Sequence, residues 1–99
     1  MEHPLAVHLR RLTASVLRGD GALPLALRRA AHDRGELPPA LQGFVEKLRS
    51  TAYQLTDEDL SALRAAGYSE DQIYELITAT ALGEGQRRLD LGLRALRGG

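Results

Sequence analysis

The stretch "TDEDLSALRAAGYSEDQ" (residues 56–72) decides the fold class, because it contains the signals of two helix starts and one helix end. Thr56 is a good N-cap, and the three acids after it lie in a first helical turn, where the helix dipole favours negative charge. Gly67 is the expected left-handed stop, and Ser69 begins a second capping box with the glutamine three residues on. Together these signals predict a well-capped helical hairpin over residues 56–82.

The rest of the chain shows the same helical pattern. Leucine and alanine recur at spacings of three and four, while alternation with a period of two is almost absent, so the chain is predicted to be all-α. The other helices are expected over residues 4–18, from residue 24 to 32 or 34 with Gly35 as the stop, over 39–52 and over 70–96. Gly83 and Gly85 interrupt the pattern of the last helix and indicate either a bend or a place where another backbone comes close.

Length and composition limit the classes of function. A chain of 99 residues has the size of one small domain, so we expect a single all-α domain over residues 1–99 with a frayed tail at 98–99. The formal net charge is zero, and no global positive field would attract nucleic acid or an anionic membrane. The absence of cysteine excludes disulfides, thiolate nucleophiles and cysteine-ligated metals. No signal peptide or membrane span is recognisable, and a cytoplasmic location is expected.

The acids after Thr56 and the histidines are the first candidates for acid–base or metal chemistry. Consecutive helical positions point about 100° apart, so adjacent carboxylates fit helix capping better than a catalytic or metal-binding pair. The histidines lack metal-ligand spacing and are interpreted as structural, the last of them with a favourable dipole contact at the end of the second helix. They are His3, His8 and His32. No metal and no cofactor is expected.

Glu84 and Arg88 fall in line with the apolar stripe of the last helix. One interpretation is an intrahelical ion pair in the favourable orientation, worth about 0.2–0.5 kcal/mol. The other is a partly buried polar site beside the two glycines, lining a pocket or an oligomer interface. Arginine pairs such as Arg28-Arg29 and Arg87-Arg88 are interpreted as solvated helix faces.

The hairpin also has the outline of a helix-turn-helix. Its second helix, however, begins with Glu70 and Asp71 and offers no arginine before Arg87, so carboxylates would face the phosphates. Binding to DNA is therefore disfavoured.

The stretch "LSALRAAGYSEDQIYELITATAL" (residues 60–82) resembles the carboxymuconolactone decarboxylase and alkyl hydroperoxidase D (AhpD) family, through a helix that ends in Ala-Ala-Gly before a serine-capped acidic helix. The resemblance implies an all-helical AhpD-like scaffold that assembles as a trimer or hexamer. The redox branch of that family carries a Cys-X-X-Cys-X-X-X-His motif before this hairpin, at the positions of Ala52, Leu55 and Asp59 here. None of the three reactive groups is present, so thiol peroxidase activity is excluded.

The functional prediction is a non-redox AhpD-like protein, acting as a homo-oligomeric scaffold or as a small-ligand-binding protein. Two alternatives stay open: a decarboxylase-like enzyme that acts on a lactone or carboxylate, and a helical protein- or DNA-binding module. No catalytic residue is assigned. The polar groups expected around a ligand pocket between helices are Tyr53, Asp59, Tyr74, Glu84 and Arg88.

Overall fold

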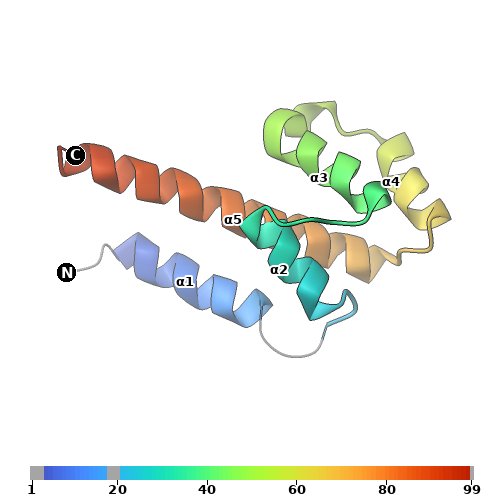
Figure 1. The fold of residues 1–99 in the computed structure, drawn as a ribbon, viewed down its shortest axis with the longest axis horizontal. Coiled ribbons are helices and arrows are strands. Elements are labelled where there is room, and N and C mark those ends of the chain that lie inside the picture. The colour runs from blue at the N-terminus through green and yellow to red at the C-terminus, as the bar shows by residue number, and fades with distance from the viewer. Residues whose placement is uncertain (1–3, 18–20, 99) are drawn as a thin grey trace.

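The computed structural model describes residues 4–17 and 21–98, and within these residues every regular element is a helix (Figure 1). The α-helices are α1 (Pro4–Val16), α2 (Leu25–Asp33), α3 (Pro39–Thr51), α4 (Asp57–Ala65) and α5 (Glu70–Leu96), and a 3-10 turn, η1 (Ala52–Gln54), follows α3. The predicted all-α class is confirmed. The predicted helix end at residue 18, His3 and Gly99 lie outside the described residues.

The long helix α5 is the element on which α1, α2 and α3 pack. Figure 1 shows α1 running antiparallel to α5 along its C-terminal half, while α3 and α4 lie over its N-terminal half. The apolar positions of α5 recur at three and four residues and therefore form one stripe that faces these neighbours. The buried core contains Leu23, Ala31, Leu41, Phe44, Val45, Leu63, Ile73, Leu76 and Ala79.

Both predicted helix starts of the hairpin are capped as expected. The Thr56 hydroxyl accepts from the backbone N–H of Asp59, and the Asp59 carboxylate accepts from the N–H of Thr56. Ser69 and Gln72 form the same reciprocal box at the start of α5. Gly67 has a φ of 101°, the left-handed conformation that ends α4. In the part of the chain that is described, no helix is both long and apolar enough to cross a membrane.

The expectation about Gly35 needs correction, and of the two explanations offered for Gly83 and Gly85, the close approach of another backbone holds at Gly83. The left-handed residue after α2 is Arg34, with a φ of 59°, and not Gly35, and the Arg34 side chain binds Glu84 on α5. Helix α5 runs through both of its central glycines without interruption. A Cβ atom on Gly83 would lie 2.1 Å from the His32 carbonyl oxygen, so this glycine marks the close crossing of α2 and α5, whereas Gly85 faces open space.

Candidate functional site

Glu84 lies where α2, α3 and α5 meet, and its carboxylate is surrounded by three arginines. Arg34, directly after α2, donates to both carboxylate oxygens, from Nε to Oε2 at 3.0 Å and from Nη2 to Oε1 at 2.5 Å. Arg87 on α5 donates from Nε to Oε2 at 3.1 Å, with Nη2 bonded to the same oxygen. Arg49 on α3 places Nε 3.6 Å from Oε2. The Glu84 side chain is only 12% exposed, so one buried carboxylate joins three elements.

Two of these arginines also close the C-terminal end of α2. Arg49 Nη2 donates to the carbonyl oxygen of Ala31 at 2.7 Å, and Arg87 Nη2 donates to that of His32 at 2.9 Å. The last carbonyls of a helix lack partners within the helix and lie at the negative end of its dipole, so cations there are favourable. The cluster around Glu84 therefore fixes the end of α2 against α3 and α5.

The cluster contains more positive than negative charge. Hydrogen bonds from Arg34, and then hydrogen bonding and charge from Arg87, lower the pKa of Glu84 from 4.5 to about 2, against the opposing effect of burial. Burial lowers the pKa of Arg49, and the positive charges of Arg34 and Arg87 act in the same direction, while the charges of Glu84 and Glu46 oppose them. Because a guanidinium keeps its proton at any physiological pH, three cations lie around the Glu84 carboxylate, and Glu46 acts on Arg49 through its charge.

A hollow of about 340 Å³ opens beside this cluster, between α3 and α5. Arg49 and Arg88 are the cations in its lining, and Glu84 is its acid. The remaining lining residues are Leu48, Ser50, Ala52, Thr80, Ala81 and Gly85. Arg49 Nε is buried without a hydrogen-bond partner within the described residues, because 3.6 Å to Glu84 is too long for a hydrogen bond.

The predicted intrahelical pair between Glu84 and Arg88 does not form. Glu84 bonds instead to Arg87, the residue before Arg88, and to Arg34, which directly follows α2. Arg88 is exposed, and no acidic side chain in the described chain pairs with it. The second interpretation, a partly buried polar site beside the glycines that lines a pocket, agrees with this geometry.

The five polar groups expected around one pocket lie in different places. Tyr53 on η1 is 84% exposed and Tyr74 on α5 is 70% exposed. Asp59 binds Lys47 Nζ at 2.9 Å, which lowers the pKa of its carboxyl group, and it borders a separate hollow between α3 and α4. Of these five groups, Glu84 and Arg88 lie together in one hollow of the described structure.

The three positions that correspond to the redox motif are also separated. Ala52 lines the hollow beside Glu84, Leu55 is half-buried and packs against the core, and Asp59 caps α4. An alanine, a leucine and a helix cap at these places supply no reactive group.

Two of the arginines interpreted as solvated are structural. Arg28 is buried and donates to the carbonyl oxygens of Leu23 and Val16, and Arg87 binds Glu84, whereas Arg29 and Arg88 are exposed. Sequence reasoning missed Arg34 and Arg49 as site residues. Neither has a local signal, since both meet Glu84 only through the tertiary fold.

Of the three histidines, His8 and His32 lie within the described residues. His32 lies in the last turn of α2, and its Nδ1 is 2.6 Å from the Asp33 carboxylate, which adds an ion pair of adjacent residues to the expected dipole contact when the ring is protonated. No group of three or more histidine or acidic side chains in the described chain is arranged to hold a metal ion.

Comparisons with known proteins add no relative: no protein-family model, no curated protein and no solved structure matches this chain. The resemblance of residues 60–82 to the AhpD family stays a prediction from the sequence. Function is therefore inferred from the geometry of the cluster around Glu84 and of the hollow beside it.

Proposed function

We propose that the chain binds a small anionic ligand, carrying a carboxylate or phosphate group, in the hollow between α3 and α5. The observation that carries this proposal is the unbalanced positive charge beside the hollow. Arg88 has no acidic partner in the described chain, and Arg49 has a buried Nε without a hydrogen-bond acceptor. A carboxylate or phosphate group would supply a negative charge beside Arg88 and a hydrogen-bond acceptor for Arg49 Nε. Guanidinium groups bind these anions through paired, charge-assisted hydrogen bonds.

The size and chemistry of the hollow favour a small ligand. At about 340 Å³ it lies at the lower end of the range for ligand pockets, roughly 300–1,000 Å³. Its two hydroxyl groups already donate to their own helices, Ser50 to the carbonyl of Glu46 and Thr80 to that of Leu76. The arginines are therefore the donors left for the ligand, so charge would dominate recognition.

The non-redox AhpD-like scaffold is part of the same proposal. The position of Ala52, where the redox branch of that family carries its first cysteine, lines this hollow. A ligand site would thus be retained where the thiol chemistry is absent. Assembly as a trimer or hexamer and a cytoplasmic location belong to the proposal and rest on the resemblance and on the sequence.

Binding, rather than acid–base catalysis, is the function that the hollow supports. Glu84 is its acid, and with a pKa of about 2 this group stays ionised at neutral pH and is a weak base. An efficient general base has a pKa near the working pH. A decarboxylase-like reaction on a lactone would therefore need a proton-transfer group other than Glu84.

A titration followed by heteronuclear NMR tests the proposal, with inorganic phosphate and succinate as separate probes. We expect saturable shifts of backbone amides in residues 48–52 and 80–88 of the wild type. The variant Arg88→Gln should bind about tenfold more weakly, a loss of about 1.4 kcal/mol. Arg29→Gln, which removes another exposed charge, from α2, is the matched control and should bind like the wild type.

Either of two results would overturn the anion site. One is shifts that grow linearly with both probes and never saturate. The other is equal weakening by Arg88→Gln and Arg29→Gln, which would show a general charge effect. Stronger saturable binding of phosphate than of succinate, or the reverse, would identify the anion class.

A further inference from the structure

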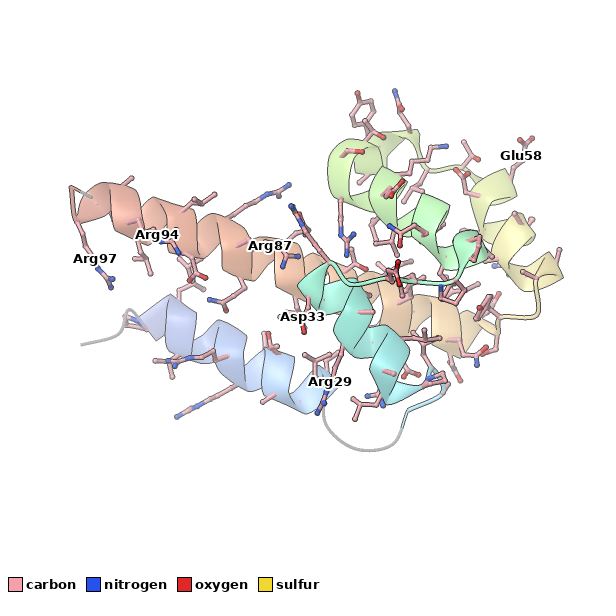
Figure 2. All side chains as sticks on the ribbon, viewed as in Figure 1. Arg29, Asp33, Glu58, Arg87, Arg94 and Arg97 are labelled. Carbon is pink, nitrogen blue, oxygen red and sulfur yellow. The ribbon has the colours of Figure 1, made fainter. Side chains whose placement is uncertain are left out.

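The two ends of the molecule carry opposite unpaired charge. At one end lie α4 and the first turn of α5, where Asp57, Glu58 and Asp71 are exposed and no cation in the described residues pairs with them. At the other end lies the last turn of α5, where Arg94 and Arg97 are exposed and likewise have no acidic partner in the described chain. Figure 2 shows Glu58 on one side of the molecule and Arg94 and Arg97 on the opposite side.

The acidic end contains an apolar hollow. It has a volume of about 250 Å³ and lies between α4 and α5. Apolar side chains and an aromatic ring line it, with one ion pair, Arg64 to Glu70 at 3.0 Å, at its edge. The lining consists of Leu60, Arg64, Glu70, Ile73, Tyr74 and Ile77. Tyr74 is 70% exposed, so the hollow is open to a partner.

The basic end presents apolar side chains that nothing in the described chain covers. Leu96 is 83% exposed and Leu91 is 63% exposed, on the part of α5 that extends past α2 and α3 (Figure 1). Compensation of the helix dipole accounts for acids at the start and arginines at the end of one helix. It does not account for the two exposed leucines near those arginines, which supply apolar area for a contact.

We propose that the C-terminal end of α5 from one copy of this chain docks into the hollow between α4 and α5 of a second copy. Leu96 would enter the apolar hollow, and Arg94 and Arg97 would meet the exposed acids of α4 and of the first turn of α5, the two helices that form the hollow. The two surfaces lie at opposite ends of the long axis, so a chain cannot fill its own hollow. The contact is head to tail, and such contacts close into rings when the rotation permits.

This contact gives a structural basis to the oligomer proposed above, and it rests on that part of the proposed function alone. Its residues do not include Arg49, Glu84 or Arg88. Loss of the contact would leave anion titrations unchanged, so the two proposals can fail separately.

Sedimentation velocity at low and high salt tests the contact. The wild type should associate at low salt and dissociate as salt screens the charges. The variant Arg94→Glu/Arg97→Glu should be monomeric at concentrations where the wild type associates. Arg11→Glu/Arg29→Glu changes the net charge equally on α1 and α2 and should associate like the wild type. A monomeric wild type at low salt overturns the proposal, as does equal loss in both double variants.

A mixing experiment excludes misfolding as the cause of any loss. The variant Glu58→Arg/Asp71→Arg reverses the acidic end and should also be monomeric by itself. Mixed in equal amounts with Arg94→Glu/Arg97→Glu, it should restore association, because each end of one variant then meets an opposite charge on the other. Circular dichroism equal to that of the wild type shows that both are folded. Two folded variants that stay monomeric when mixed overturn the proposal.

Discussion

Glu84 connects parts of the chain that the sequence keeps far apart. It is on α5, and its arginine partners follow α2, lie on α3 and lie one turn further along α5. The partner after α2 is held in a left-handed conformation that non-glycine residues rarely adopt, and its bonds to Glu84 compensate for that strain. The carboxylate is nearly buried, so its removal leaves guanidinium groups without their counter-charge.

Replacing this carboxylate by its neutral isostere measures how much it stabilises the fold. We expect Glu84→Gln to lower the free energy of unfolding by about 3 kcal/mol, because removing one partner of a buried pair leaves the other uncompensated. Urea denaturation at neutral pH gives this number. Arg88→Gln, an exposed change one turn further along the same helix, should stay within about 0.5 kcal/mol of the wild type. Equal effects of the two substitutions would contradict the assignment.

The same carboxylate predicts a pH dependence. Its pKa is about 2 in the folded chain and 4.5 without these contacts, so its contribution is fully present above pH 4.5 and is lost as the pH falls towards 2. The shift corresponds to about 3 kcal/mol. The stability difference between the wild type and Glu84→Gln should therefore be constant from pH 7 to about pH 5 and close by about pH 2. A difference that persists at pH 2 would show that the loss comes from packing.

The crossing of α2 over α5 depends on one missing side chain. The His32 carbonyl oxygen occupies the space that a Cβ of residue 83 would need, and the same oxygen accepts from Arg87. Gly85, two positions on, has nothing within 4 Å of its Cβ position. Packing against α2 thus requires a glycine at position 83, whereas no steric contact requires one at position 85.

These glycines provide a matched pair of substitutions. Gly83→Ala should destabilise the fold by at least about 2 kcal/mol, because α2 must move away from α5. Gly85→Ala should stabilise it by about 0.5–1 kcal/mol through the higher helix propensity of alanine. Thermal unfolding of both variants decides the matter. If both stabilise the protein, the backbones do not cross as closely as described.

Local signals were sufficient to predict the helices. The roles of Gly83 and Arg34 depend on long-range contacts. The starts at Thr56 and Ser69 and the stop at Gly67 follow from capping chemistry between near neighbours. The sequence offered two explanations for Gly83, and only the position of α2 selects one. Glu84 could be found from its place on an apolar stripe. Arg34 could not be found in this way, because it lies 50 residues from Glu84 in the sequence and adopts a left-handed conformation in which glycine is expected.

The molecule as a whole is elongated, with extents of 47 × 30 × 20 Å. The other helices bury α5 unevenly along its length. The buried side chains of this helix end at Glu84, and beyond it no residue of α5 is fully buried. Stability should therefore be graded along a single helix. Residues 76–84 include the buried positions Leu76, Ala79, Thr80, Gly83 and Glu84, while residues 90–96 are half-buried or exposed and run beside α1 (Figure 1).

Hydrogen exchange measures this gradient. At high salt, where association through the ends of α5 is screened, amides of residues 76–84 should exchange slowest, near the rate of global unfolding. Amides of residues 90–96 should exchange at least about tenfold faster through local opening. Uniform protection along the whole helix would contradict the gradient. At low salt, slower exchange over residues 90–96 would report the contact with a second copy.

The position of α5 in the chain also affects how the protein is made. Helices α1, α2 and α3 all pack on residues 70–96, which the ribosome synthesises after them. A nascent chain that ends before residue 70 has four short helices but lacks the helix on which α1, α2 and α3 pack. Isolated helices of this length are marginal in water. The core is therefore expected to form after α5 has been synthesised. A translational pause before this helix would prolong the time during which the apolar faces of α1 to α4 are exposed to chaperones and proteases.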